Sequence, residues 1–199
     1  MPSGRKKPYH HGNLRESLLD AAEAALAEMS LEKVSLREIA RRAGVSHAAP
    51  KHHFGSLGAL LGEVAARGFD RFVTALNEAA SRGDQSPPAR MRSMMRAYLK
   101  FAADNPAAYG LMFGKRDNVE ATPHLMEAMF AAWAQLENQV RDVVSESRKT
   151  YGAVAVWSAV HGLAMLRMDR KTPPHIDPDA AIENLSRIIV AGLQSEAGS

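Results

Sequence analysis

The stretch Ser35-Leu-Arg-Glu-Ile-Ala-Arg-Arg-Ala-Gly-Val-Ser46 decides the fold, because it has the pattern of two short helices joined by a tight turn. Ser35 and Glu38 have the spacing of a capping box at a helix start. Gly44 can adopt the positive backbone angle φ that a tight turn needs, so it marks the end of this helix. We expect Ser46 to cap the helix that follows. The pattern predicts a helix-turn-helix, whose second helix fits the major groove of DNA.

The rest of the chain also has a helical pattern of apolar residues. Apolar positions recur at helical spacing over residues 14–29, and similar segments follow on both sides of a loop at residues 81–88. Thr122-Pro123 and Asp177-Pro178 have the composition of helix starts. The sequence contains no strand of useful length, no internal repeat and no low-complexity tract. We therefore predict an all-α fold with about eight to ten helices.

Positive charge is concentrated in the first third of the chain. The 199 residues carry a formal net charge of +3, and residues 1–60 contain nine Lys and Arg against six Asp and Glu. This asymmetry favours a polyanionic partner, with a solvated basic surface as the alternative. The absence of cysteine excludes disulfides, thiolate nucleophiles and cysteine-based metal sites. No apolar run approaches the ~20 residues of a membrane-spanning helix, and no signal peptide is recognisable, so we expect a cytoplasmic protein.

Beyond the helix-turn-helix, residues 13–72 resemble the N-terminal domain of TetR/AcrR-family transcriptional regulators. The matching segments are Leu36-Arg-Glu-Ile-Ala40, Ala43-Gly-Val-Ser46, His53-Phe54 and Ala59-Leu-Leu61. Two further segments are similar to one subgroup of that family, namely Tyr9-His-His-Gly-Asn-Leu-Arg15 and His47-Ala-Ala-Pro50. The subgroup is named for a Trp-His-Gly feature in its C-terminal domain, for which the candidates here are Trp157, His161 and Gly162.

The resemblance implies a fold in two parts and a regulatory function. Residues 1–55 would form an N-terminal arm and a three-helix DNA-binding domain, and residues 56–199 a helical ligand-binding and dimerisation domain. Members of the family bind operator DNA and usually release it when a small molecule binds. We therefore expect a ligand-responsive regulator, with repression as the first choice, no catalytic activity and no cofactor. Its expected partners are double-stranded operator DNA, a small apolar or aromatic effector and a second copy of the chain, but no membrane.

The expected DNA contacts come from the basic N-terminal arm and from the starts of the two short helices. In the family, the first turn of the second helix reads bases, which implies base contacts for His47, Ala48 and Lys51 here. The basic arm would enter a minor groove, unless it is an unstructured tail. Lys51 is also a candidate for a phosphate contact, and the remaining candidates would contact the DNA backbone. The full set is Arg5, Lys6, Lys7, Ser35, Arg37, Ser46, His47, Ala48, Lys51 and His52.

The sequence departs from the family pattern close to these contacts. Lys51 stands where a tyrosine is usual, and Leu57 stands where a lysine is usual, followed by Gly58 in place of an acidic residue. The family uses this tyrosine and this lysine on DNA phosphates, so we expect an altered phosphate geometry. Pro50 is a second complication. With Ser46 as the N-cap, Pro50 would be the fourth helical residue and would remove the first internal hydrogen bond.

The later helices are rich in methionine and aromatic residues. Methionine adapts to irregular apolar shapes, so this cluster predicts a ligand pocket, although ordinary core packing produces the same spacing. His161 lies one helical turn after Trp157 and would orient a ligand, or else is a core histidine with its hydrogen bonds satisfied. The expected ligand-binding residues are Met95, Met112, Phe113, Met126, Phe130, Trp133, Trp157 and His161.

Two other functions stay open at this level. A metal-dependent helical enzyme would have to use the pairs His10-His11 and His52-His53, but neighbouring histidines on a helix point about 100° apart. The sequence has no His-Glu-x-x-His motif, no Ser-His-Asp set and no glycine-rich phosphate loop, which argues against catalysis. The other alternative is a helix-turn-helix fold that serves only as an interaction module, which the changes at Lys51 and Leu57 would permit.

Overall fold

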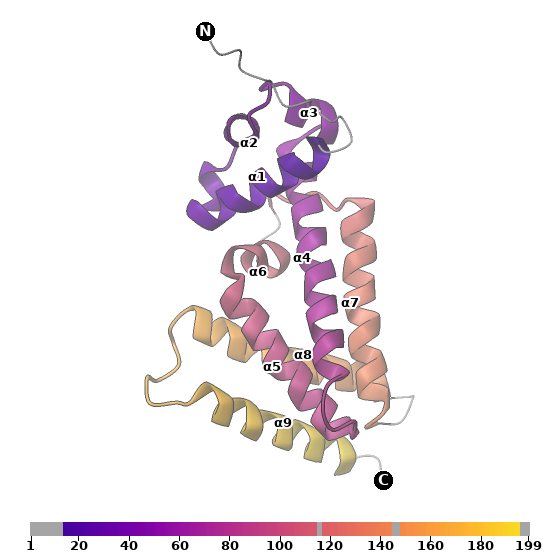
Figure 1. The fold of residues 1–199 in the computed structure, drawn as a ribbon. Coiled ribbons are helices and arrows are strands. Elements are labelled where there is room, and N and C mark those ends of the chain that lie inside the picture. The colour runs from indigo at the N-terminus through magenta and orange to yellow at the C-terminus, as the bar shows by residue number, and fades with distance from the viewer. Residues whose placement is uncertain (1–13, 115–116, 145–147, 196–199) are drawn as a thin grey trace, which may run out of the picture.

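The computed structural model describes residues 14–114, 117–144 and 148–195 (Figure 1). Within these ranges the chain forms nine α-helices and one 3-10 turn, Leu31–Lys33, and no strand, which confirms the predicted all-α fold. The helices are α1 (Leu14–Glu28), α2 (Leu36–Ala43), α3 (Ala49–Phe54), α4 (Leu57–Ala80), α5 (Pro87–Asp104), α6 (Pro106–Phe113), α7 (Pro123–Arg141), α8 (Lys149–Met168) and α9 (Pro178–Ser195).

The helices form an elongated molecule in which α1, α2 and α3 lie together at one end (Figure 1). α4 has 24 residues and runs from this end along α7 toward the other. α5 packs against α4, and α8 and α9 lie across the opposite end. α4 is therefore the element that extends from the helix-turn-helix into the rest of the molecule. None of the described helices combines the length and the apolar character that a bilayer crossing requires.

Local signals set most of the helix ends. The hydroxyls of Ser35, Ser56 and Thr122 each accept a hydrogen bond from the backbone N–H three residues on, at 3.2, 2.9 and 3.2 Å. Caps of this kind contribute about 1 kcal/mol each. Gly44 ends α2 in the left-handed conformation with φ 68°, as predicted. Glu38, which we expected to complete a capping box, instead accepts hydrogen bonds from two arginines of its own helix.

The start of α3 differs from the prediction that Ser46 caps it. α3 begins at Ala49, and its N-cap is Ala48, which makes no side-chain capping bond. Ser46 lies in the preceding turn, where its carbonyl oxygen accepts a hydrogen bond from the Ala49 N–H at 3.0 Å. Pro50 explains the shift, because it becomes the second helical residue, where a missing N–H needs no partner. The hydrogen bond that we expected Pro50 to remove is therefore never required.

A continuous apolar core runs the length of the molecule. At the helix-turn-helix end, Leu18 of α1 and Ile39 of α2 are fully buried and belong to the same core as Leu60 of α4. Further along α4, Phe72 packs edge to face on Tyr98 of α5, with ring centroids 5.0 Å apart. Val160 of α8 is also part of this core. The two ends of the molecule are thus joined by packed side chains and not by a flexible linker.

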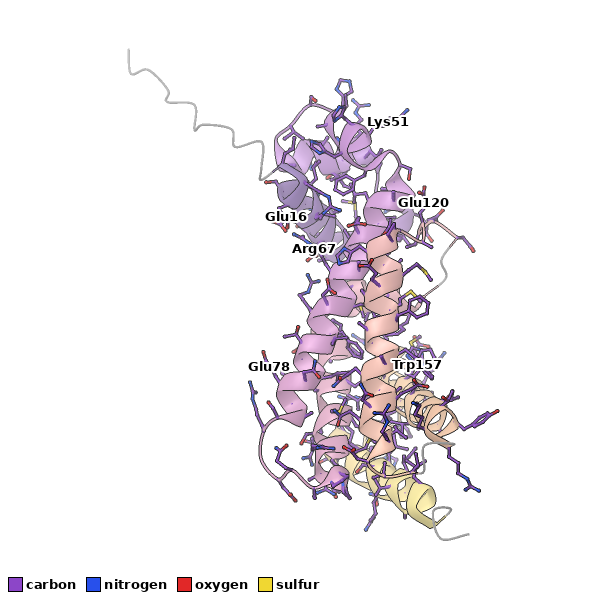
Figure 2. All side chains as sticks on the ribbon, turned by 90° about the vertical axis from the view of Figure 1, so that its right-hand side faces the viewer. Glu16, Lys51, Arg67, Glu78, Glu120 and Trp157 are labelled. Atoms are coloured by element: carbon purple, nitrogen blue, oxygen red, sulfur yellow. The ribbon has the colours of Figure 1, made fainter. Side chains whose placement is uncertain are left out.

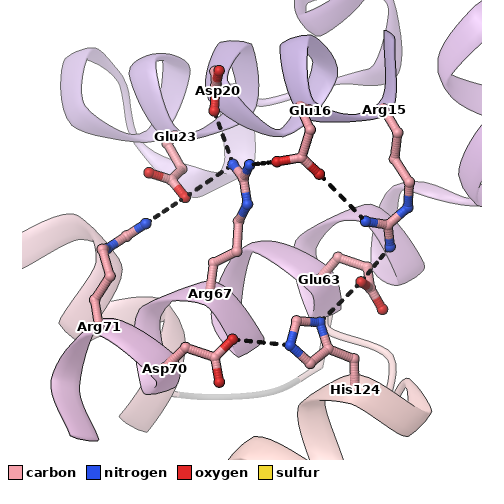
Figure 3. A network of polar contacts seen from close by, with 9 residues as sticks. All are labelled: Arg15, Glu16, Asp20, Glu23, Glu63, Arg67, Asp70, Arg71 and His124. Carbon is pink, nitrogen blue, oxygen red and sulfur yellow. Dashed lines mark hydrogen bonds and ion pairs between the residues drawn. The ribbon is translucent and has the colours of Figure 1, made fainter. Parts of the chain in front are cut away.

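Ion pairs hold α1 against α4 on the surface beside this core (Figure 3). Arg67 of α4 forms a pair with Asp20 at 2.9 Å and another with Glu16, both on α1. One turn further along α4, Arg71 pairs with Glu23 at 2.9 Å. Single exposed pairs contribute about 0–1 kcal/mol, so their effect here depends on their being linked in a network.

A second set of charged contacts adds α7 to this arrangement. The side chain of His124, at the start of α7, places Nδ1 3.2 Å from Glu63 and Nε2 2.9 Å from Asp70, both on α4. Glu63 is also paired with Arg15 of α1. Burial by itself lowers the pKa of His124, but the hydrogen bonds and charges of the two carboxylates outweigh it and raise the pKa above its ordinary value. The imidazole therefore bridges two points of α4, and the two carboxylates favour its protonated form.

Candidate DNA-binding face and ligand cavity

The surface of α2 and α3 forms the outer end of the molecule, where Figure 2 shows Lys51. The residues that we expected to bind DNA and that the structure describes are all exposed, namely Ser35, Arg37, Ser46, His47, Ala48, Lys51 and His52. The predicted arm residues Arg5, Lys6 and Lys7 lie outside the described residues. This end of the molecule therefore presents the predicted side chains together on its surface.

A hollow of about 420 Å³ lies between α2 and the turn that precedes α3. Four of the predicted residues line it, namely Ser35, Arg37, Ser46 and His47. Sequence reasoning missed Arg41, which lines the same hollow and whose side chain is 69% exposed. Arg41 follows Arg37 by four positions, so the two lie on one face of the helix. That spacing was the signal that could have identified it.

Glu38 organises the charge on α2. Its carboxylate accepts hydrogen bonds from Arg41 at 2.8 and 2.6 Å and from Arg42 at 2.8 Å. These hydrogen bonds, from Arg41 first and then Arg42, lower the pKa of Glu38 to about 2. Glu38 is therefore ionised at neutral pH and offsets part of the positive charge of α2. Arg37 and Lys51 form no ion pair with any described residue, which leaves their charges available to a phosphate.

The packing around α4 explains why position 58 is a glycine. Glu120, in the connection between α6 and α7, donates its backbone N–H to the Gly58 carbonyl oxygen at 3.1 Å, and its side chain accepts a hydrogen bond from Ser56. A Cβ atom on Gly58 would lie 2.9 Å from the Glu120 side chain. A Cβ atom on Gly62 would lie 2.4 Å from the Glu120 carbonyl oxygen. The two glycines therefore let this connection pack against the first turns of α4.

A cavity of about 410 Å³ lies between α4, α5, α6, α7 and α8. Figure 2 shows Trp157, one of its lining residues, far along the molecule from Lys51. The volume falls within the roughly 300–1,000 Å³ of small-molecule sites. Nearly all of the lining is apolar or aromatic, and it consists of Phe69, Phe72, Leu76, Met94, Tyr98, Phe113, Met129, Ala132, Trp133, Leu136, Trp157, Ser158, Val160 and His161.

Three polar side chains meet at the wall of this cavity. Nδ1 of His161 lies 3.0 Å from the Tyr98 hydroxyl and 2.7 Å from the Tyr109 hydroxyl, and the two hydroxyls are 3.0 Å apart. Burial lowers the pKa of His161, raises the pKa of Tyr98 to about 12 and raises that of Tyr109 as well. All three groups are therefore neutral at pH 7. Sequence reasoning identified His161 but missed both tyrosines.

Two family models cover most of the chain. Residues 18–64 match the model of bacterial regulatory proteins of the tetR family. Residues 91–189 match the model of a tetracyclin repressor-like C-terminal domain. The chain belongs to the TetR family. It is thus a DNA-binding transcription regulator with a helix-turn-helix, from a family of transcriptional regulators.

Solved structures share this TetR-family fold over almost the whole chain. A protein of unknown function from Rhodococcus sp. RHA1 is 31% identical, with a TM-score of 0.83 over 95% of this chain and 100% of that chain. PfmR, a TetR family transcriptional regulator from Thermus thermophilus, is 22% identical, with a TM-score of 0.64 over 88% and 98%. A tetR-family transcriptional regulator from Streptomyces coelicolor is 20% identical, with a TM-score of 0.70 over 95% and 83%. The comparison with curated proteins gave no match.

Half of the residues that we expected to bind a ligand line the cavity of this TetR-family chain. They are Phe113, Trp133, Trp157 and His161. Trp133 and Trp157 lie edge to face with ring centroids 6.3 Å apart, and the Trp157 and His161 rings are 5.9 Å apart. The prediction that Trp157 and His161 share one helix face therefore agrees with the structure.

The other half of the expected ligand-binding residues do not line the cavity. Met95 and Met112 are buried in the core, where Met112 packs against a glycine of α4. Met126 is partly buried outside the lining, and Phe130 is 65% exposed on the outer face of α7. Met95 directly follows the lining residue Met94, and one step along a helix rotates the side chain by about 100°. Helical spacing identified the apolar segments but not the side chains that face the cavity.

Proposed function

We propose that this TetR-family regulator is a homodimeric repressor that leaves its operator when a small apolar or aromatic molecule occupies the cavity. The observation that carries the proposal is that the single helix α4 extends from the helix-turn-helix to the cavity. Its first turn follows α3 directly, and further along the same helix Phe69, Phe72 and Leu76 line the cavity. A ligand that binds one position of α4 more tightly than another would shift the population of that position, and with it the affinity for DNA.

We place the DNA contacts on the exposed face of α2 and α3. His47 and Ala48, in the turn before α3, would meet base edges in the major groove. Ser35, Arg37, Ser46, Lys51 and His52 would bind the phosphate backbone, and Arg5, Lys6 and Lys7 a minor groove. The proposed boundary between the DNA-binding and the ligand-binding domain is residues 55 and 56, immediately before α4.

Exposed apolar side chains on α8 and α9 support a homodimer. Tyr151 and Val154 of α8 are 80% and 44% exposed, and Ile188 of α9 is 68% exposed. Large apolar side chains gathered on one surface are typical of protein interfaces. A symmetric dimer would bring two copies of α3 to half-sites about one helical turn of DNA, ~34–36 Å, apart.

We also propose that the chain belongs to the Trp-His-Gly subgroup of the family. The support is that Trp157 and His161 lie on the wall of the cavity, one helical turn apart. Gly162 follows on the same helix, and a Cβ atom there would meet nothing within 4 Å. In this chain the feature would therefore act through the two side chains.

DNA binding is best tested on the region upstream of the protein's own gene, with a salt titration. We expect salt-dependent binding, and we expect Lys51→Ala to weaken it and to reduce the salt slope by about one. Lys100→Ala is the matched control, because Lys100 lies on α5 and pairs with Asp104 of the same helix at 2.6 Å. An unchanged slope in Lys51→Ala would exclude the phosphate contact. No salt-dependent binding to this or any selected DNA would favour an interaction module.

A further inference from the structure

We infer that the cavity selects a neutral aromatic molecule that carries a hydrogen-bond acceptor such as a ketone, which accepts from Nε2–H of His161. The inference rests on the proposed function of the cavity as an effector site. It adds the chemical class of the effector and the group that recognises it.

Hydrogen-bond counting fixes which ring nitrogen of His161 carries the proton. Nδ1 and the hydroxyls of Tyr98 and Tyr109 lie 2.7 to 3.0 Å from one another, and both tyrosines are buried. If Nδ1 has no proton, one hydroxyl donates to the other and the second donates to Nδ1, so both protons have acceptors. If Nδ1 carries the proton, one of the two hydroxyls has no acceptor left among the described residues, which is unfavourable for a buried side chain. The neutral ring therefore carries its proton on Nε2.

Nε2 of His161 is accessible on a side chain that lines the cavity. His161 lines the cavity, and the hydrogen bonds of its ring among the described residues all involve Nδ1. Among the described residues, the buried side-chain polar atoms without a partner consist of Arg90 Nε alone, so the unpaired Nε2 is not buried. An accessible N–H on the wall of a cavity is available as a donor to a ligand.

The other polar groups of the lining restrict further the class of ligand that fits the cavity. The indole N–H of Trp157, another lining residue, can only donate, so it too requires an acceptor on the ligand. Ser158 also lines the cavity, and it supplies a hydroxyl. A neutral molecule with one acceptor matches this small set of polar groups.

The lining also disfavours a charged effector and favours a ligand with aromatic rings. It contains no Lys, Arg, Asp or Glu among the described residues, so an ionised ligand would have no partner of opposite charge. Phe72, Phe113, Trp133 and Trp157 supply aromatic faces and edges on several sides. Aromatic rings prefer offset-stacked or edge-to-face partners, which these side chains offer to a flat molecule.

Three ligands on one tricyclic skeleton test this inference on the full-length protein. Fluorene has no acceptor, fluorenone adds a neutral ketone, and fluorenecarboxylate adds a charge. We expect titration calorimetry to give fluorenone an affinity about three- to ten-fold above that of fluorene, the range for one net hydrogen bond, with fluorenecarboxylate weakest. His161→Leu should remove the preference for fluorenone and leave fluorene binding.

Ser158→Ala is the matched control, because it removes another polar side chain of the lining and should keep the preference. Equal affinities of fluorene and fluorenone for the wild type, or a preference lost in Ser158→Ala and kept in His161→Leu, would overturn the donor role of His161 and leave the effector site intact. If no member of the series binds, both the effector site and the inference are wrong.

Nitrogen-15 NMR of the His161 ring in the ligand-free wild type is an independent test of the same inference. We expect the proton on Nε2 in the wild type at neutral pH. The Tyr98→Phe, Tyr109→Phe double variant, which removes both hydroxyl donors to Nδ1, should raise the population of the other tautomer and weaken the preference for fluorenone. A proton on Nδ1 in the wild type would overturn the inference whatever the ligands do.

Discussion

Replacement of Gly62 by alanine tests the close packing of the connection between α6 and α7 on α4. The new Cβ atom would lie 2.4 Å from the carbonyl oxygen of Glu120 and 2.9 Å from Cγ2 of Thr122. The first contact is with backbone, which cannot turn away as the end of a side chain can. The connection must therefore move by roughly 1 Å to reach an ordinary van der Waals distance, because carbon contacts are optimal at about 3.5–4.0 Å.

The magnitude follows from two opposing effects. Overpacking of a well-packed site costs about 1–3 kcal/mol, and we take the upper value because the opposing atom belongs to the backbone. Alanine gains about 1 kcal/mol over glycine in a helix interior. The net loss of stability for Gly62→Ala is then about 2 kcal/mol. In a chain of 199 residues this lowers the Tm by about 4–8 °C.

The matched control is Gly110→Ala in α6. Gly110 is also helical, but a Cβ atom on it would meet nothing within 4 Å, so the alanine should raise the Tm by about 2–4 °C. Both variants would be melted at the same protein concentration and followed by the helical circular dichroism signal, because dimerisation makes the Tm concentration-dependent. A Gly62→Ala protein that melts at or above the wild-type temperature would refute the reasoning.

Three further predictions concern the pH dependence, the helix caps and the cavity. The pKa of His124 is raised by Glu63 and Asp70 in the folded state, so its contribution to stability is complete below the ordinary pKa of 6.5 and is lost as the pH rises through the folded value. The Tm difference between the wild type and His124→Gln should therefore shrink as the pH rises from below 6.5 through the folded pKa, and a constant difference would contradict the bridge. Ser35→Ala should cost about 1 kcal/mol in chemical denaturation and Ser46→Ala almost nothing, whereas equal losses would restore Ser46 as a cap. Because both tryptophans of the chain line the cavity, fluorenone should quench their emission, and quenching of neither would place it elsewhere.

The helices could be predicted because local signals define them. Caps such as Ser35 and Ser56 act on N–H groups three residues away, and Gly44 acts on its own turn. The predicted start of α3 was wrong because two local signals compete there. The preference of Ser46 for a cap position loses to the requirement that Pro50 lie in the first turn.

The two candidate sites differ in how much of them a sequence can indicate. The DNA face comes from one continuous stretch, residues 35–52, so its exposed side chains could be predicted from short-range spacing. The cavity draws on five helices, and Tyr98 reaches His161 across 63 positions of the chain. Helical periodicity distinguishes an apolar face from a polar one, but packing of distant helices decides where that face leaves a void. For this reason the spacing could not show that Phe130 lies exposed and outside the cavity.

Leu57 and Gly58, which depart from the family pattern, lie where the proposed coupling between the DNA-binding face and the cavity would act. The connection that packs on Gly58 joins α6, which supplies Phe113 to the cavity, to α7, which supplies Trp133. Through Glu120 the same connection binds Ser56, the cap of α4 and the second residue after α3. A ligand that displaces α6 or α7 would therefore act on the first turn of α4 directly. A bulky acidic residue at position 58 would crowd the Glu120 side chain, and we therefore propose that the glycine serves the coupling as well as the packing.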